Sequence, residues 1–255
     1  MSGISAVVIT RNEAGNIERC LQSLSFCDEI IVVDSHSDDG TRELAGKYTE
    51  KVYTRDWSGY ADQKNYAVGL CQNDWVLSVD ADEQVTDELR SEILTKLQNA
   101  SNACVAYTVP RKTIHSGRWI RHGGWYPNRL IRFFKKSSGE WVGSEIHERW
   151  QPAGGVEDLQ GHLKHYSFTS FADQVARNNH YSTLGAELLR RQGKKPSIVK
   201  MIHKPFWKFV ETYFIKRGFL DGVPGFIIAI SAAYSVFMKW AKLWEMDRRE
   251  AQGKI

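Results

Sequence analysis

Two acidic side chains, Asp80 and Asp82, follow directly after Trp75 to Val79, an apolar run with the length of a β-strand. Such a run is typical of a buried strand, so the acids are expected at the edge of a sheet. Residues two apart in an extended chain project to the same side, so the carboxylates can converge. Carboxylate oxygens suit Mg²⁺ or Mn²⁺, which would in turn hold phosphates. An acidic turn before a helix capped by Thr86 or Asp87 would give the same pattern.

Polar residues also follow two other expected strands, 4–10 and 29–34. A further short strand is expected at 52–54, with helices between the strands and over 87–97. Strand and helix alternate with short connections, which indicates βαβ units and a parallel sheet. In such sheets ligands bind beyond the carboxyl ends of the strands. The three polar clusters are therefore expected at one rim.

The glycine-rich phosphate loops are missing from this chain. No G-x-G-x-x-G follows the first strand, and no Walker A motif occurs anywhere. A bound nucleotide would therefore have to be held by metal and carboxylates rather than by a glycine-rich turn.

Taken together, these strand ends resemble the nucleotide-sugar half of a family 2 glycosyltransferase with the GT-A fold. The motifs are T-x-N-E at 10–13, D-S-x-S-x-D-G-T at 34–41, Q-K-N at 63–65 and D-A-D-E at 80–83. Three later motifs resemble the bacterial lipopolysaccharide-core β-1,4-glucosyltransferases of that family: W-I-R-H-G-G-W-Y-P at 119–127, I-H-E at 146–148 and G-F-L-D-G at 218–222. The resemblance covers nearly the whole chain.

The resemblance implies an α/β chain with a Rossmann-like, mostly parallel sheet flanked by helices and a C-terminal helical extension. Residues 1–110 would form the nucleotide-sugar half of the GT-A domain. Residues 111–170 would form its acceptor-binding and catalytic half, and residues 171–255 a membrane-facing helical segment.

For the donor, the resemblance implies that Thr10, Glu13 and Asp34 contact the uracil and ribose of a UDP-sugar. Asp80 would lie near the ribose or the metal, and Asp82 would bind the metal, Mg²⁺ or Mn²⁺, that bridges the diphosphate. Lys64 would meet a phosphate or the base, or else be a surface lysine. The full set of expected nucleotide-sugar ligands is Thr10, Asn12, Glu13, Asp34, Ser35, Gln63, Lys64 and Asp80.

Glu145, His147 and Glu148 place two carboxylates and an imidazole within four residues. Inverting sugar transfer needs one carboxylate to take the proton from the attacking hydroxyl while a metal stabilises the departing diphosphate. The resemblance favours Glu148 as this base. Glu145 stays an alternative, because the family usually carries an Asp at this position. His147 is expected as a further metal ligand, since imidazole accepts Mn²⁺ more readily than Mg²⁺.

Arginines alternate with aromatic residues from Arg118 to Arg132. Aromatic faces stack on sugar rings and arginines bind phosphates through two hydrogen bonds, so this composition suits a phosphorylated saccharide. The tryptophans could instead seal a small subdomain. Nucleic acid is not expected as a partner, because no nucleic-acid module occurs and this half is net acidic. The expected acceptor-binding residues are Trp119, Arg121, His122, Trp125, Tyr126, Arg129 and Arg132.

The charge of the chain is divided unevenly. From Phe171 onward there are 15 lysines and arginines against 7 acids, whereas residues 1 to 170 carry 19 against 23. Large aromatics and lysines mix between 206 and 217, as they do in helices at a membrane surface. The apolar run 223–238 has 16 residues, fewer than the about 20 that a spanning helix needs. The sequence thus predicts peripheral attachment to an anionic inner membrane.

The cytoplasm is the expected compartment. The four cysteines show no metal-binding spacing, and no secretion signal precedes the first strand. The protein is therefore expected on the cytoplasmic face of the inner membrane.

The expected function is inverting, metal-dependent transfer of a hexose, in the first place glucose from UDP-glucose, onto a heptose of the lipopolysaccharide inner core. Two groups of alternatives remain. The acceptor could be polyprenyl phosphate, another glycolipid or a peptide. The chain could also be a sugar-nucleotide-binding protein without catalysis, which would need no general base.

Overall fold

The computed structural model describes residues 3–98, 104–143, 148–168 and 170–252, and it divides into two compact units. Unit 1 contains residues 1–112 and 127–166, and unit 2 contains residues 113–126 and 167–255. The sequence divided the chain at residues 110 and 170. In the structure the helical unit also takes in the segment 113–126.

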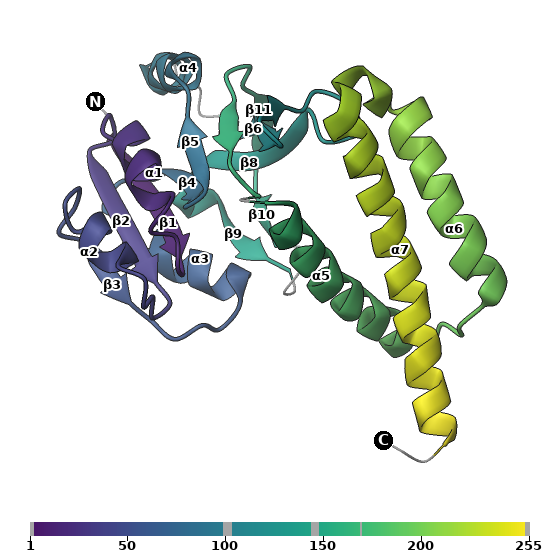
Figure 1. Cartoon of the computed structure of the whole chain (residues 1–255). Coiled ribbons are helices and arrows are strands. Elements are labelled where there is room, and N and C mark those ends of the chain that lie inside the picture. The colour runs from purple at the N-terminus through teal and green to yellow at the C-terminus, as the bar shows by residue number, and fades with distance from the viewer. Residues whose placement is uncertain (1–2, 99–103, 144–147, 169, 253–255) are drawn as a thin grey trace. The chain divides into compact units, whose positions relative to one another are not determined.

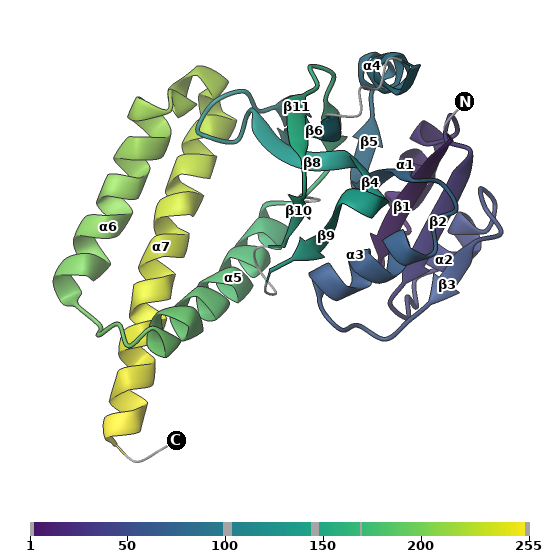
Figure 2. The same cartoon turned by 180° about the vertical axis from the view of Figure 1, so that it is seen from behind.

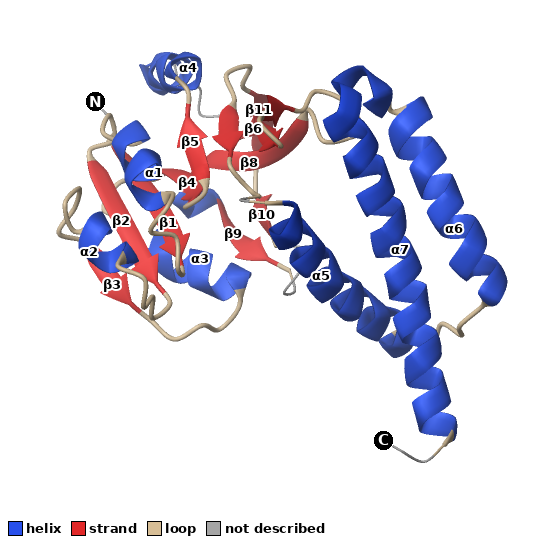
Figure 3. Ribbon diagram, viewed as in Figure 1, coloured by secondary structure: helices blue, strands red, loops and turns tan. Residues whose placement is uncertain are grey.

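Unit 1 is built on a mixed sheet with the strand order β3-β2-β1-β4-β8-β6-β12-β5 (Figure 3). The strands β1 (Ile4–Thr10), β2 (Glu29–Asp34), β3 (Val52–Thr54) and β4 (Trp75–Asp80) pair in parallel. They confirm the expected βαβ pattern. Antiparallel pairing joins β8 (Asn128–Lys135) to β4 and to β6 (Cys104–His115), and β12 (Leu163–His165) to β5 (Glu83–Val85).

Shorter strands complete unit 1. The strand β11 (Gly155–Asp158) pairs with β6, and β9 (Gly139–Val142) pairs with β10 (Arg149–Pro152) as a separate ribbon. A single 3₁₀ turn, η1 (Lys136–Ser138), leads from β8 into β9.

Helices cover both faces of the parallel part of the sheet (Figure 1). The four are α1 (Ile17–Ser23), α2 (Thr41–Ala45), α3 (Tyr60–Gly69) and α4 (Asp87–Gln98). Because strand side chains alternate between the faces, Ala6 and Val8 pack with Ile17 on one side, and Val7 packs with Ala67 on the other. Burial on both faces explains why these strands read as unbroken apolar runs.

Unit 2 is helical, with α5 (Phe171–Arg191), α6 (Ile198–Val210) and α7 (Gly222–Ala251). Ser170 and Ser197 cap α5 and α6 by accepting from backbone N–H groups, as helix N-caps do. A π-helical turn, η2 (Glu211–Ile215), and a 3₁₀ turn, η3 (Gly218–Asp221), connect α6 to α7, which lie side by side in both views (Figures 1 and 2). The short strand β7 (Arg118–Trp119) pairs with the end of β6 as a hairpin.

Helix α7 is longer than its apolar run predicts, because charged residues continue it to Ala251. Among the described residues, the stretch Gly218–Ala251 is the one that is long and apolar enough to cross a membrane, with 28% of its most apolar window buried. One face of α7, with Gly225, Ile228 and Ala229, is buried, whereas Val223, Phe226 and Ile230 are exposed. One face of α7 is thus packed within unit 2 and an apolar face is exposed.

Candidate functional site

The polar strand ends lie at one rim of unit 1, because the parallel strands pair in register. Thr10 at the end of β1 is opposite Asp34 at the end of β2, and Ile9 is opposite Asp80 at the end of β4. The side-chain hydroxyl of Thr10 is buried and has no hydrogen-bond partner among the described residues. A buried hydroxyl without a partner is costly, so a ligand group at this position would stabilise it.

Asp34 organises the loop after β2. Its carboxylate is fully buried and accepts from the backbone N–H of Ser37 at 2.8 Å and from the Ser37 hydroxyl. The Ser37 hydroxyl oxygen in turn accepts from the backbone N–H of Asn12 at 2.8 Å, and Asn12 Oδ1 accepts from the backbone of Asp38 at 3.0 Å. The loops that follow β1 and β2 are therefore tied together, which fixes Asp34 and Asn12 at the rim.

Glu13, Ser35 and Gln63 lie in the same network. The backbone N–H of Glu13 donates to the Thr41 hydroxyl at 2.9 Å, and Gln63 Nε2 donates to the Ser35 hydroxyl at 3.0 Å. Arg55 donates to Gln63 Oε1 at 3.0 Å. Ser35 and Gln63 are buried, so they support the rim from behind rather than exposing free polar atoms to solvent.

Lys64 is buried, with 2% of its surface exposed, which excludes the surface-lysine alternative. Its Nζ lies 3.2 Å from Asp80 Oδ1 and 3.1 Å from Glu148 Oε1, and it lies 4.5 Å from the centre of the Trp141 ring. A buried ammonium is stable only when carboxylates or other acceptors compensate its charge. Lys64 thus joins the strand-end acid Asp80 to Glu148, the residue expected as the base.

Asp80 is bound by arginines as well. Arg132 reaches both Asp80 oxygens, Oδ1 at 3.2 Å, and also donates to Glu83 Oε1 at 3.0 Å. Arg111 lies 3.3 Å from Glu83 and 4.0 Å from Asp80. Burial acts to raise the pKa of Asp80, but the charges of Arg132 and Lys64 outweigh it and hold the pKa well below its usual range.

The structure therefore gives Asp80 and Arg132 roles that the sequence did not distinguish. Arg132 was expected among the acceptor-binding residues, but its side chain is 2% exposed and its two terminal nitrogens pair with Asp80 and Glu83. Asp80 has its oxygens occupied by three cations, so little of its carboxylate remains for a metal. The two acids of the D-x-D motif thus have different surroundings.

Asp82 is separate from the arginine network. Its Oδ2 lies 3.2 Å from His165 Nε2, and the two side chains are 16% and 11% exposed. Within the described ranges, no cluster of three or more histidines, cysteines or acids that could hold a metal is present. One carboxylate and one imidazole nevertheless fit a cation whose other ligands come from substrate phosphates and water.

His165 was missed from the sequence. It lies on β12, which pairs with β5 so that His165 is opposite Glu83, far away in the chain. No local spacing signals that pairing. Glu145 and His147, expected as the alternative base and a metal ligand, lie outside the described residues.

The expected acceptor residues divide between the two units. Trp119, Arg121, His122, Trp125 and Tyr126 belong to unit 2, whereas Arg129 and Arg132 belong to unit 1. In unit 2 the Trp125 ring meets His115 edge-on at 5.7 Å, and His115 Nε2 lies 2.9 Å from Gln174 Oε1. In unit 1 Arg129 donates to the Leu159 carbonyl at 2.9 Å.

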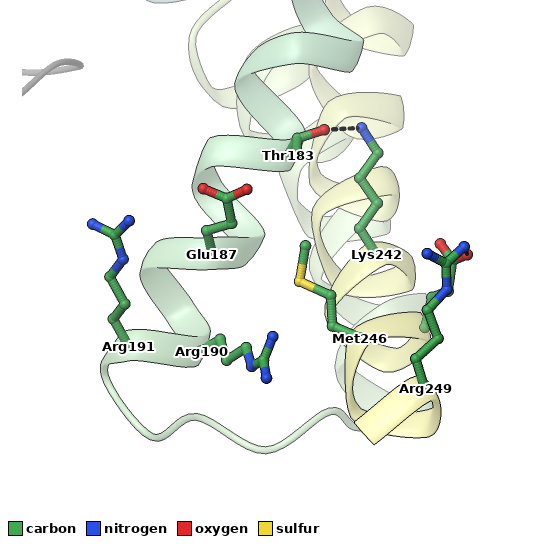
Figure 4. A pocket seen from close by; sticks show the side chains of 8 residues that line it. Thr183, Glu187, Arg190, Arg191, Lys242, Met246 and Arg249 are labelled. Atoms are coloured by element: carbon green, nitrogen blue, oxygen red, sulfur yellow. Dashed lines mark hydrogen bonds and ion pairs between the residues drawn. The ribbon is translucent and has the colours of Figure 1, made fainter. Parts of the chain in front are cut away.

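A groove of about 750 Å³ lies within unit 2 between α5 and α7, and its polar side chains are mostly paired (Figure 4). Lys242 donates to Asn179, Ser182 and Thr183, Arg190 lies 3.1 Å from Glu250, and Arg249 lies 2.5 Å from Glu245. Arg190 and Arg249 are paired with acids, whereas the partners of Lys242 are uncharged. The groove is lined by Thr183, Glu187, Arg190, Arg191, Lys242, Glu245, Met246 and Arg249.

Comparison with known proteins gives the family. The model described as "Glycosyl transferase family 2" matches residues 5–153. An uncharacterized glycosyltransferase of Rickettsia bellii is 36% identical over 257 residues, covering 96% of this chain and 87% of the relative. The lipopolysaccharide core biosynthesis glycosyltransferase LpsC of Rhizobium meliloti is 31% identical over 259 residues, covering 99% of this chain and 96% of the relative.

Among solved structures, glucosyl-3-phosphoglycerate synthase of Mycobacterium tuberculosis, in complex with Mn²⁺, UDP and phosphoglyceric acid, has a TM-score of 0.51 at 15% identity. The match covers 77% of this chain and 80% of that one. The chain therefore belongs to glycosyltransferase family 2, and its fold is GT-A, as expected.

Proposed function

We propose that this family 2 glycosyltransferase moves a hexose, glucose from UDP-glucose, onto a heptose of the lipopolysaccharide inner core with inversion at the anomeric carbon. The observation that carries the catalytic part is the ion-pair link from Asp80 through Lys64 to Glu148. It holds a carboxylate at the rim where the donor is expected. The name of the relative LpsC, lipopolysaccharide core biosynthesis glycosyltransferase, supports the class of acceptor.

The donor would bind along the strand ends. Thr10 offers its unpartnered hydroxyl and Glu13 its carboxylate to the ribose and uracil, while the buried Asp34, bonded to Ser37, fixes the loop that carries Asn12. Carboxylates accept well from ribose hydroxyls. Ser35 and Gln63 support this surface through their mutual hydrogen bond.

Asp82 and His165 would hold the divalent cation, with His147 as the further ligand expected from the sequence. Their oxygen and nitrogen atoms are 3.2 Å apart, and neither side chain takes part in the arginine network. When bound, such a cation neutralises the charge that develops on a departing diphosphate. The Mn²⁺ and UDP in the glucosyl-3-phosphoglycerate synthase complex support a cation in this fold.

Glu148 would act as the general base. Its carboxylate would accept the proton of the attacking heptose hydroxyl. The hydroxyl oxygen bonds to the anomeric carbon while the bond from that carbon to the β-phosphate oxygen breaks and UDP leaves on the opposite side. Lys64 keeps that carboxylate in place through the 3.1 Å ion pair. The residues of this network bind and orient the substrates, and one proton moves from the heptose hydroxyl to Glu148.

We also propose peripheral attachment to the cytoplasmic face of the inner membrane. Helix α6 exposes Ile198, Val199, Ile202 and Phe206 on one side, each at 65% or more. Lysines follow on the same helix at 200, 204 and 208. Exposed apolar side chains accompanied by lysines suit an anionic lipid surface.

The experiment that tests the reaction is UDP release from a panel of UDP-sugars, with and without core oligosaccharide. We expect release with UDP-glucose only when the heptose acceptor is present. Release with another sugar or another acceptor would replace that part of the proposal. Donor binding without transfer to any acceptor would favour a sugar-nucleotide-binding protein.

A further inference from the structure

Two sequence motifs that the proposed reaction does not use, W-I-R-H-G-G at 119–124 and G-F-L-D-G at 218–222, contact each other within unit 2. Asp221 Oδ2 accepts from the backbone N–H of Arg121 at 3.0 Å and from that of His122 at 2.7 Å. Asp221 Oδ1 lies 3.2 Å from His122 Nδ1. The side chain of Asp221 is 2% exposed, so one buried carboxylate holds a loop that is about a hundred residues away in the chain.

Glycines allow this close approach. Gly123 and Gly124 both have positive φ, 67° and 80°, and the backbone N–H of Gly123 donates to the Lys216 carbonyl at 2.8 Å. A Cβ on Gly225 would lie 1.9 Å from the Gly218 carbonyl oxygen, which no side chain tolerates. The loop and the start of α7 are therefore held in one arrangement.

The held loop presents cations to solvent. Arg118 is 53% exposed, and one of its nitrogens donates to the Leu220 carbonyl at 3.1 Å. Arg121 and Arg217 are exposed, and within the described residues neither side chain has a hydrogen-bond or ion-pair partner. We call Arg118, Arg121 and Arg217 the basic half of the clasp surface.

Exposed apolar side chains adjoin this basic half. Ile215 is 59% exposed, Leu220 is 47% exposed and Val223 is 71% exposed. The hydrogen bond from Arg118 to the Leu220 carbonyl places cation and apolar residue next to each other. The Tyr213 ring contacts the Phe219 and Phe226 rings at 6.2 and 5.7 Å, and these two rings are themselves partly exposed. We call Ile215, Leu220 and Val223 its apolar half.

We propose that the clasp surface binds the acceptor as a phosphorylated glycolipid, with its phosphates on the basic half and its lipid end on the apolar half. This rests on the proposed function, and it specifies the acceptor as an anionic amphiphile. Guanidinium groups bind phosphate through paired, charge-assisted hydrogen bonds. A free sugar phosphate would use the cations but leave the apolar half exposed. Asp221 is a positioning residue, because it fixes the loop that carries Arg121.

The first test compares acceptors in transfer kinetics with the full chain. The probes are a phosphorylated lipopolysaccharide-core glycolipid in detergent micelles, its deacylated form and its dephosphorylated form. A lost hydrogen bond to a charged group weakens binding about tenfold or more. Arg121→Gln should therefore raise the KM of the phosphorylated acceptors about tenfold or more, since about 1.4 kcal/mol is tenfold. Arg121→Gln should leave the KM of the dephosphorylated acceptor unchanged. Val223→Ser should raise the KM only for the acylated acceptor.

The control is Arg191→Gln, which removes an exposed arginine from α5 in the same unit and should change no KM. The KM of the donor should stay constant in every variant. Asp221→Ala should reproduce the effect of Arg121→Gln, and Asp221→Asn, which keeps an acceptor oxygen, should recover part of it. A uniform loss of kcat with no change in acceptor KM would indicate a merely structural Asp221.

The second test does not depend on turnover. The full chain is sedimented with phosphatidylcholine vesicles that contain or lack the phosphorylated glycolipid. We expect binding only to the vesicles that contain it, and a loss of that binding in Arg121→Gln. If Arg121→Gln and Val223→Ser change neither sedimentation nor any acceptor KM, the clasp surface is not the acceptor site. If the wild type binds the glycolipid through Arg121 but transfers no sugar, the proposed reaction fails and the clasp surface stands.

Discussion

Asp80 and Asp82 are two residues apart but have different partners. Asp80 is bound by Arg132, Lys64 and Arg111, whereas Asp82 lies beside His165. The spacing of the two acids predicts that both carboxylates converge on a metal. In the structure three cations surround Asp80, so less of its carboxylate is free for a metal than that of Asp82. We therefore infer that the two acids have different roles. Asp80 orients Lys64 and Arg132, and Asp82 is available to a ligand.

The first prediction concerns Glu148. Glu148→Gln keeps the size of the side chain but cannot accept the proton, so kcat should fall about 10²–10⁴-fold. The KM of the donor should stay nearly constant, because donor binding depends on Thr10, Asp34 and Asp82. Steady-state UDP release measures both kcat and the KM of the donor. Glu145→Gln is the matched control and should lose much less activity. If Glu145→Gln loses most of its kcat and Glu148→Gln keeps a nearly normal kcat, Glu145 is the general base instead of Glu148.

The second prediction concerns the cation. Asp82→Ala and His165→Ala should each lower the affinity for UDP in the presence of Mg²⁺ or Mn²⁺, and neither should change the affinity measured in EDTA. Isothermal calorimetry measures both affinities. Arg55→Gln, which changes the rim without touching Asp82 or His165, should not alter the dependence on metal. Equal UDP affinity of the wild type with and without metal would rule out this site.

At the scale of elements, the parallel half of the sheet could be predicted almost to the residue. Its strands are buried on both faces, so the apolar runs that end at Thr10, Asp34 and Asp80 are continuous and their limits are visible. Arg132 was expected to bind the acceptor, and His165 was missed, for the opposite reason. Their roles depend on β8 and β12 joining the sheet antiparallel, and such long-range pairing leaves no local pattern.

The third prediction concerns the network that links β4, β8 and α3 through Asp80, Arg132 and Lys64. The folded pKa of Asp80 is depressed, so the stabilisation is present above the ordinary carboxyl pKa of about 3.9 and is lost as the pH falls through the folded pKa. Asp80→Asn leaves two buried cations undercompensated and should cost about 3 kcal/mol near neutral pH. Urea unfolding at several pH values measures this.

The difference between wild type and Asp80→Asn should narrow as the pH is lowered below about 4, because Asp80 of the unfolded chain takes up a proton there while the folded carboxylate, with its depressed pKa, stays ionised to lower pH. Asp56→Asn is the control. Its carboxylate is almost fully exposed and pairs only with His36 at the surface, so its removal should change stability little. A constant difference between Asp80→Asn and wild type at every pH would contradict the electrostatic origin of the stabilisation.

At the scale of the whole molecule, the uneven charge of the chain matches its two units. The acidic N-terminal half carries the rim of carboxylates, and the basic C-terminal part carries the exposed apolar side chains of α6 and α7. The uneven charge is visible in the composition alone, whereas the boundaries at 110 and 170 came from the family resemblance, and the structure also assigns 113–126 to unit 2. The sequence did not predict the length of α7, because the charged residues after Met238 end the apolar run but continue the helix.

The last prediction asks how the chain meets the membrane. If α6 and the exposed face of α7 only lie on the surface, membrane-bound protein should be released by high salt, because ionic screening weakens its attraction to anionic lipid. If α7 crosses the bilayer, only detergent should release it.

Ile202→Ser together with Phe206→Ser should lower sedimentation with phosphatidylglycerol-containing vesicles at low salt, since both side chains are about two-thirds exposed on α6. Arg191→Gln should lower sedimentation less, because a single basic residue near the membrane surface adds only about 1 kcal/mol.

For the wild type we expect release by salt. One face of α7, with Ile228 and Ala229, is buried within its own unit, so this helix cannot face lipid on all sides. Retention in salt-washed membranes would show instead that α7 leaves that packing and spans.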